Sequence, residues 1–294
     1  MPTDAMLTGH RRAANTRALV ALMRLNRSPM VAIIAGTAAF AAGAGVGHAL
    51  WMTLAGFCLA VGGFSLDLYA DRDLDGSGPR AERRHNPFAA GVLTPTAGLA
   101  FSVTFILISL ALVVALFPAA LLPWGIILAI IVGLALHAFE PPIARALTLG
   151  ALQALYALMG SMAGRLNGGL VLFAGVLFFA MFGGRGMIDV RDFAQDQASR
   201  LPTLPQRYGV QRTAQFTAVC LLISYALSLA AYVVGPFSRA YLYLDLLFIA
   251  VGLVCAWLFV AHPTPRMAHA LTNVCMVGEG LLICLAVVLG SGAL

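Results

Sequence analysis

The chain has 294 residues, of which 61% are hydrophobic and only 10% are charged. A soluble domain carries about a quarter charged residues, so this composition excludes an ordinary soluble protein and predicts an all-α, polytopic membrane protein in a lipid bilayer. The formal net charge of +6 comes entirely from Arg, because the sequence has no Lys, and no nucleic-acid partner is expected.

Nine apolar segments are long enough to form membrane-spanning helices, since a span needs about 20 mostly apolar residues. Their expected ranges are 28–46, 50–70, 96–116, 119–137, 146–164, 168–187, 213–234, 241–261 and 269–290. We expect residues 1–27 to form a cytoplasmic N-terminal segment. Residues 28–294 are expected to form a single nine-helix bundle around a central apolar cavity.

The placement of Arg predicts how the chain is oriented. With nine spans, 16 of the 18 Arg residues fall on the side that carries the N-terminus, and only Arg165 and Arg239 fall on the other. Cytoplasmic loops are enriched in Arg. The sequence therefore predicts a multi-pass protein of a bacterial inner or cell membrane, with its N-terminus and both long polar loops in the cytoplasm.

Carboxylates are concentrated at the cytoplasmic ends of the second and sixth predicted helices. Seven of the 12 acidic residues lie there: Asp67, Asp71, Asp73 and Asp75, then Asp189, Asp192 and Asp196. Except for Asp73, which points elsewhere, the spacing puts the three aspartates of each stretch on one helix face. Like charges one turn apart repel each other, so each stripe predicts a bound cation.

Magnesium is the cation that fits these six aspartates best. Mg²⁺ prefers oxygen ligands and commonly bridges carboxylates to phosphates, and no His or Cys accompanies the acids as zinc would require. The five Cys residues all lie in apolar runs without a CxxC pair. They are expected to be buried packing residues rather than a metal or redox site.

Arginines accompany both stretches. Arg72 and Arg84 follow the first, Arg185 lies one turn before Asp189, and Arg191 lies within the second. Carboxylates, a divalent metal and arginines together predict a diphosphate site, in which the metal neutralises the anion and Arg holds its oxygens. The alternative is that these arginines are only cytoplasmic anchors or ion-pair partners.

The two stretches resemble the motifs of the UbiA-type intramembrane prenyltransferase superfamily. The segment LDLYADRDLD at 66–75 resembles N-D-x-x-D-x-x-x-D, and NPFAAG at 86–91 resembles the later R-P-x-x-x-G. The second stretch, with TLP at 203–205, resembles D-x-x-D-x-x-x-D-x-x-x-G-x-x-T-L-P. Three residues depart from the family pattern, namely Leu66 for Asn, Asn86 for Arg and Arg200 for Gly, so a divergent member is expected.

The resemblance implies a substrate and a reaction. An isoprenyl diphosphate would lose its diphosphate to give an allylic carbocation, which a hydrophobic acceptor, aromatic or polyene, would trap. FEPPIAR at 139–145 resembles a family segment whose basic residue, here Arg145, faces the diphosphate. Tyr69 and Tyr156 are candidates for cation–π contact with the carbocation, with ordinary packing as the alternative.

Two matters stay open at this point. Glu279 lies midway along the last apolar segment, where an acid is a functional candidate; it either orients or deprotonates an acceptor, or is a protonated carboxyl bonded between helices. The scaffold also suits a terpene cyclase, in which the substrate's own double bonds trap the carbocation. A third hypothesis is a membrane transporter in which the acids bind a cation, although transporter sites tend to lie near the midplane between repeated halves.

Overall fold

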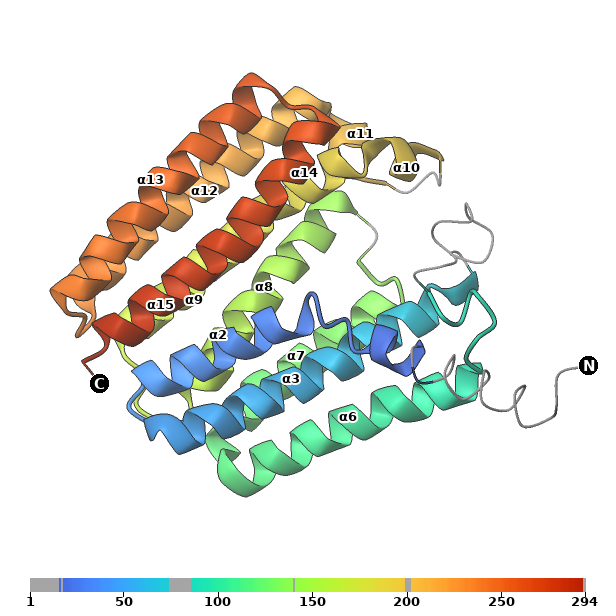
Figure 1. Ribbon diagram of the computed structural model, residues 1–294, viewed down its shortest axis with the longest axis horizontal. Coiled ribbons are helices and arrows are strands. Elements are labelled where there is room, and N and C mark those ends of the chain that lie inside the picture. The colour runs from blue at the N-terminus through green and yellow to red at the C-terminus, as the bar shows by residue number, and fades with distance from the viewer. Residues whose placement is uncertain (1–15, 17, 74–85, 140, 199–201, 293–294) are drawn as a thin grey trace, which may run out of the picture.

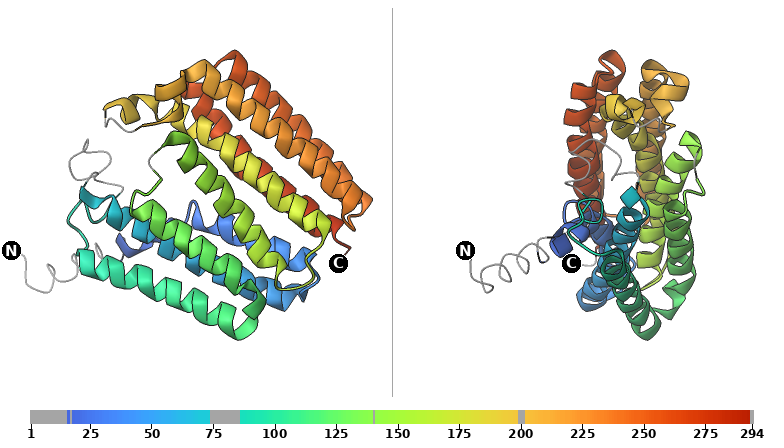
Figure 2. Two further views of the ribbon diagram at one scale, coloured as in Figure 1. Left: turned by 180° about the vertical axis from the view of Figure 1, so that it is seen from behind. Right: turned by 90° about the vertical axis from the view of Figure 1, so that its right-hand side faces the viewer.

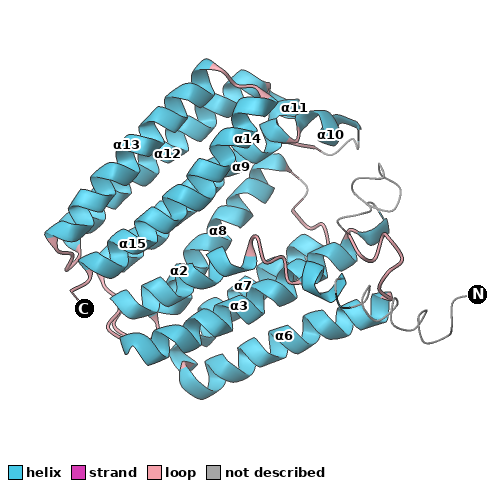
Figure 3. Ribbon diagram, viewed as in Figure 1, coloured by secondary structure: helices cyan, strands magenta, loops and turns pink. Residues whose placement is uncertain are grey.

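The computed structural model describes residues 16, 18–73, 86–139, 141–198 and 202–292, which form helices and loops but no strand (Figure 3). The helices are α2 (Ser28–Ala41), α3 (Gly45–Ala70), α6 (Pro95–Leu116), η1 (Pro118–Ala120), α7 (Leu121–Ala135), α8 (Pro142–Ser161), α9 (Gly168–Arg191), α10 (Phe193–Ala198), α11 (Leu204–Tyr208), α12 (Val210–Val234), α13 (Arg239–Ala261), α14 (Pro265–Asn273), the π-helical η2 (Val274–Glu279) and α15 (Gly280–Gly290). Eight helical stretches are long and apolar enough to cross a membrane. The predicted all-α, polytopic fold class is therefore confirmed.

Polar caps fix where several of these apolar helices begin. The side-chain oxygens of Thr94, Asn167 and Thr264 accept hydrogen bonds from backbone N–H groups three residues on, at 3.3, 3.0 and 3.3 Å. Such caps satisfy donors that the first turn of a helix leaves free. Pro at the first helical turn of α6 and α14 adds a fixed φ that suits a helix start.

All nine predicted segments contain a helix, but the first is shorter than expected. α2 has 14 residues, which is about 21 Å of helix, and it ends five residues before the predicted boundary at residue 46. The reason lies in Gly43 and Gly45, whose φ angles of +80° and +78° turn the backbone out of the right-handed helix. α3 then starts at Gly45, earlier than predicted.

The bundle has two sides. Figure 1 shows α2, α3, α13 and the α14–η2–α15 run in front, and the left view of Figure 2 shows α7, α8, α9 and α12 from behind. α9 packs against both α8 and α12, and α2 packs against α3 and α8. The surface carries exposed apolar side chains such as Leu122, Val233 and Trp257, which suits contact with lipid.

Small residues let these helices approach closely, as is usual in membrane bundles. A Cβ atom added at Gly160 of α8 would overlap the backbone of Ala35 in α2. Gly183 of α9 lies against α12, where the Thr217 hydroxyl donates a 2.9 Å hydrogen bond to the Gly183 carbonyl. The second contact packs α9 against α12. α9 carries Asp189, the first residue of the second aspartate stretch.

Candidate active site

The first aspartate stretch closes α3. Asp71 is the residue that ends the helix, and its backbone N–H donates to the Asp67 carbonyl at 2.9 Å. Both side chains are partly buried. The Asp71 carboxylate lies 3.7 Å from Nε2 of His137, which follows α7 and has a positive φ of +53°. Asp75 and Arg84, the remaining predicted residues of this loop, lie outside the described residues.

Arg72 and Asp73 turn away from the stripe. As expected, Asp73 is exposed; it pairs with Arg72 at 3.4 Å. The Arg72 guanidinium also covers the ring of Tyr69, with its Cζ 4.4 Å from the ring centroid, and donates to the Tyr69 carbonyl at 2.9 Å. The Tyr69 ring meets Phe88 edge-on. In this conformation Arg72 and Tyr69 are engaged with each other and with the loop.

The second stretch begins at a buried ion pair. Asp189 of α9 is 2% exposed, and its Oδ1 lies 2.6 Å from Nε of Arg185, one turn earlier. Its other oxygen, Oδ2, accepts the backbone N–H of Leu204 at 3.2 Å. The TLP segment thus has a physical role, because Leu204 begins α11 and ties that short helix to the aspartate.

α9 ends before the stretch does. Asp192 follows its last residue, and Asp196 lies on the separate helix α10, with its backbone N–H donating to the Asp192 carbonyl at 2.9 Å. The Arg191 guanidinium donates two hydrogen bonds, of 2.7 and 2.6 Å, to the Asp192 carboxylate. The i, i+3, i+7 stripe is therefore interrupted at Asp192 rather than carried by one continuous helix.

The charged groups of the second stretch shift the pKa of Asp196. Burial raises the pKa of Asp196 to about 6, with the neighbouring carboxylates Asp189 and Asp192 adding to the rise and Arg185 and Arg145 opposing it. Crowded carboxylates with a raised pKa are a common sign of a site built to hold positive charge. Arg145, on α8, is thereby placed within electrostatic range of this stretch.

Arg27 connects the two stretches and was not predicted as a site residue. It directly precedes α2 and its side chain is exposed. Desolvation by the surrounding protein, together with the charges of Arg24, Arg191 and Arg185, lowers its pKa, while the Asp67 carboxylate opposes this. Arg27 is therefore within electrostatic range of Asp67 of α3 and of Arg185 and Arg191 of α9. The ends of α3 and α9 and the start of α8 lie on the same side of the bundle as α10 and α11 (Figure 1).

A surface hollow of about 570 Å³ borders this region. It is lined by Arg191, Asp192, Pro265, Arg266 and His269. Sequence reasoning counted Arg266 only as an orientation marker and expected nothing of His269. Because α14 comes late in the chain, only the packing of α14 against α9 could have placed these residues beside Asp192.

Asn86 and Leu66, two departures from the family motifs, have structural roles. Asn86 is fully buried; its amide donates to the Leu68 carbonyl at 2.8 Å, and its oxygen accepts from the backbone N–H of Phe88 at 3.0 Å. Asn86 therefore docks the loop before α6 onto the end of α3. Leu66 is partly buried and packs against the main hydrophobic core.

Tyr156 and Glu279 lie deeper in the bundle. Tyr156 of α8 is 4% exposed and belongs to the main hydrophobic core. Glu279 is also 4% exposed, and its Oε2 accepts a hydrogen bond of 3.3 Å from the hydroxyl of Tyr225 in α12. These contacts link Glu279 to α12 rather than to the aspartates.

Comparison with known proteins identifies the family. The model of the UbiA prenyltransferase family matches residues 29–277. The chain belongs to this family. Membership of the UbiA family confirms the predicted prenyltransferase and favours an enzyme over the transporter reading. No curated protein matches the chain.

Solved structures share the UbiA fold at low sequence identity. A digeranylgeranylglyceryl phosphate synthase is 18% identical, with a TM-score of 0.77 over 95% of this chain and 99% of that one. A UbiA homologue from Archaeoglobus fulgidus bound to GPP and Mg²⁺ is 17% identical, with a TM-score of 0.73 over 92% of this chain and 99% of that one. One from Aeropyrum pernix K1 is 19% identical, with a TM-score of 0.71 over 88% and 98%. The fold of these proteins is therefore the fold of this chain.

Proposed function

We propose that this protein transfers a prenyl group from an isoprenyl diphosphate to a hydrophobic acceptor, an aromatic ring or a polyene, within the membrane. The supporting observation is that aspartates from α3 and from α9–α10 share one end of the bundle with Arg27, Arg145 and Arg185. In the Archaeoglobus fulgidus homologue, DMAPP or GPP is bound together with Mg²⁺. The charge-rich end of this chain is suited to the same class of anion.

The aspartates fit magnesium by their chemistry. The described members are Asp67, Asp71, Asp189, Asp192 and Asp196, and Asp75 completes the first motif of the family. They offer only oxygen ligands, and the raised pKa of Asp196 reflects crowded negative charge that a cation would relieve. When bound, Mg²⁺ supplies positive charge that stabilises the leaving diphosphate.

The arginines divide into two groups. Arg191 is held in a two-bond pair with Asp192, so it orients that carboxylate. Arg27 and Arg145 lie within electrostatic range of the aspartates, and Arg185 pairs with Asp189 through Nε. We assign these three to the diphosphate oxygens, to which guanidinium groups can bind in a bidentate way. We assign Arg72, which follows α3, to the outer side of the diphosphate, and Arg84, outside the described residues, to the diphosphate from its place in the sequence alone.

The reaction follows from this arrangement. The allylic C–O bond breaks, its electron pair leaves with the diphosphate, and an allylic carbocation remains. A π bond of the acceptor attacks the cation, and a proton then leaves the acceptor carbon. Buried apolar walls protect the cation from water; we assign Tyr156 to the wall of the tail path and Tyr69 to its mouth, where an aromatic face would stabilise positive charge.

The experiment that tests this function uses purified protein, Mg²⁺ and geranyl, farnesyl or geranylgeranyl diphosphate, each with and without a membrane lipid extract. Mass spectrometry is expected to find a prenylated acceptor, with diphosphate release that depends on the extract. A cyclic hydrocarbon or alcohol formed without the extract would replace the transferase by the terpene cyclase. If Asp71→Ala and Asp192→Ala both left diphosphate release intact, the enzyme site itself would be wrong.

The orientation belongs to the same proposal. We place the aspartates and the N-terminus on the cytoplasmic side, because 16 of 18 Arg residues gather there. Cysteine labelling of intact cells tests it: a single Cys introduced at exposed Asp73 is expected to stay unlabelled by an impermeant maleimide until the membrane is opened.

A further inference from the structure

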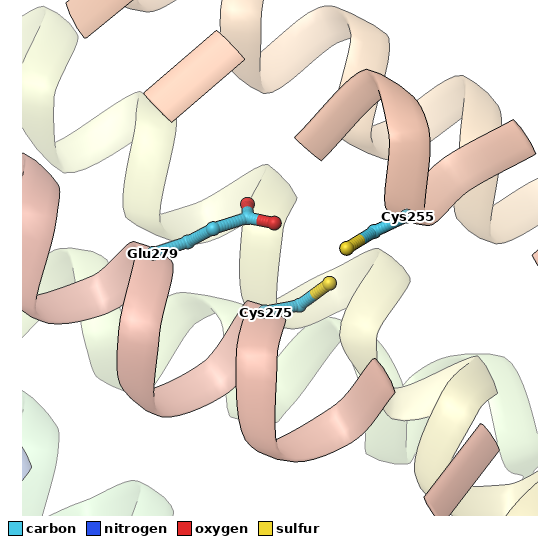
Figure 4. Close-up of side chains that lie close together, drawn as sticks. All are labelled: Cys255, Cys275 and Glu279. Carbon is cyan, nitrogen blue, oxygen red and sulfur yellow. The ribbon is translucent and has the colours of Figure 1, made fainter. Parts of the chain in front are cut away.

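A second polar cluster lies inside the bundle, away from the aspartates. It contains Cys255 of α13 and Cys275 and Glu279 of η2, whose ligand atoms all lie within 4.8 Å of one another. Figure 4 shows the three side chains converging from two helices. Cys255 and Glu279 are 5% and 4% exposed and Cys275 is half-buried, so most of the cluster is enclosed by protein. The sequence indicated only packing roles for the cysteines, because residues 20 positions apart gave no metal-ligand spacing.

The backbone supports this convergence. Residues 274–279 form a π-helix, between α14 and α15. Short π-helical turns inside α-helices are rare and occur frequently at functional sites. Cys275 and Glu279 are four residues apart and therefore point to the same side. The Cys275 sulfur lies within 4.8 Å of both the Cys255 sulfur and a carboxylate oxygen of Glu279.

Glu279 provides an independent observation. Its Oε2 accepts the hydrogen bond from Tyr225, but its Oε1 is buried and, within the described part of the chain, accepts none. A buried polar atom left without a partner is costly and calls for an explanation. A metal ion bound by Oε1 and the two sulfurs would supply the missing partner, and Tyr225 would orient the carboxylate as outer-shell partners do.

We propose that Cys255, Cys275 and Glu279 form a binding site for a thiophilic divalent cation, of which Zn²⁺ is the best match. Thiolate and carboxylate ligands are those that zinc takes, and three protein ligands leave a fourth position open. Thiolates do not suit Mg²⁺, which prefers oxygen. The site is thus chemically separate from the aspartates. Binding releases the thiol protons, because the metal takes the deprotonated ligands.

The site is also within reach of the aqueous end of the bundle. Cys255 lies six residues before the end of α13 at Ala261, which is about 9 Å along the helix axis. The α13–α14 connection at that end leads to the hollow lined by Arg191, Arg266 and His269. A metal ion bound at the site would tie α13 to η2 by direct bonds.

Cobalt is the probe for the test. Purified protein is stripped with chelator and titrated with Co²⁺ under reducing conditions, with excess Mg²⁺ present to occupy the aspartates. We expect a thiolate-to-cobalt charge-transfer band that saturates at one Co²⁺ per chain and is removed by Zn²⁺. Tyr225→Phe is expected to weaken Co²⁺ binding by about 10- to 100-fold, the usual effect of losing an outer-shell partner.

Matched cysteine variants show which side chains give rise to the charge-transfer band. Cys255→Ser and Cys275→Ser are expected to abolish it, whereas Cys58→Ser and Cys220→Ser, at buried cysteines of other helices, keep it. Absence of the band in the wild-type protein, which requires no variant to fold, overturns the proposal. So does a band that survives the Cys255→Ser/Cys275→Ser double variant. A Cys255–Cys275 disulfide in the freshly purified, non-reduced chain would overturn it as well.

Discussion

Oδ1 of Asp189 lies 2.6 Å from Nε of Arg185, one turn away on α9, and both side chains are largely enclosed. The pair places a guanidinium and a carboxylate of the candidate site on one rigid helix, between α8 and α12. The Leu204 N–H fixes the second carboxylate oxygen. The orientation of Asp189 is thus set from two sides.

Arg185→Met is expected to destabilise the fold. It removes the cation and leaves the Asp189 carboxylate buried without its charge partner, a change that typically costs about 3–5 kcal/mol. The double variant Arg185→Met/Asp189→Asn removes both charges and should recover part of the loss. Thermal unfolding in detergent measures this; an equal loss in both variants would show that the pair is not the source.

Asp71 and Asp73, two residues apart at the end of α3, allow a matched comparison of two aspartate variants. Asp71→Ala is expected to lower diphosphate release at least about 100-fold, since a missing metal ligand removes electrostatic stabilisation of the leaving group. Asp73→Ala, whose side chain pairs outward with Arg72, should stay within a few-fold of wild type. Steady-state rates of diphosphate release at saturating Mg²⁺ are the measurement. Similar losses in both variants would contradict the assignment of Asp71, and not Asp73, as a metal ligand.

The stability of the metal-free protein should fall between about pH 4 and pH 6. The pKa of Asp196 is raised to about 6 in the folded chain, against about 3.9 for an unfolded Asp, so the folded state binds more protons in this window and stability decreases as pH rises. Asp196→Asn should flatten this slope, and Mg²⁺ should oppose it by taking the place of the proton. The test measures the melting temperatures of the wild-type protein and of Asp196→Asn between about pH 4 and pH 6, with chelator and with Mg²⁺. A rise of stability with pH that Asp196→Asn leaves unchanged would contradict the assignment.

Asn86→Ala should loosen the loop on the end of α3. It leaves the buried Leu68 carbonyl and Phe88 N–H without their partners, and an unsatisfied buried polar group costs about 1–3 kcal/mol. Unfolding temperature and prenyl-diphosphate activity are both expected to drop. Asn86→Asp keeps the acceptor oxygen and should fall between the two proteins; an Asn86→Ala variant as stable as wild type would show that the loop docks by other contacts.

Local patterns carried much of the prediction. Apolar segments of membrane length located each long helix of the described chain, and the aspartate spacing placed Asp67 and Asp71 at the end of α3 and Asp189 near the end of α9. The shortness of α2 was missed: Gly43 and Gly45 lie inside the predicted span, but the sequence does not show that both adopt positive φ angles. What the sequence could not show depends on packing between distant segments: the electrostatic influence of both Asp67 and Arg185 on Arg27, the hydrogen bond from Leu204 to Asp189, and the approach of Cys255 to Cys275. The central apolar cavity stays a prediction.

The short helix α2 has a consequence for how a substrate would enter. Its far end lies beside Arg165, whose N–H donates to the Ala42 carbonyl, and its 14 residues rise only about 21 Å through a hydrocarbon layer about 30 Å thick. A helix of this length, standing along the bilayer normal, falls about 9 Å short of crossing that layer. Beside a span that falls short in this way, a diphosphate would stay hydrated while its isoprenoid chain remains among the acyl tails. A substrate entering sideways from the bilayer avoids the cost of about 0.8 kcal/mol for each CH₂ group drawn into water.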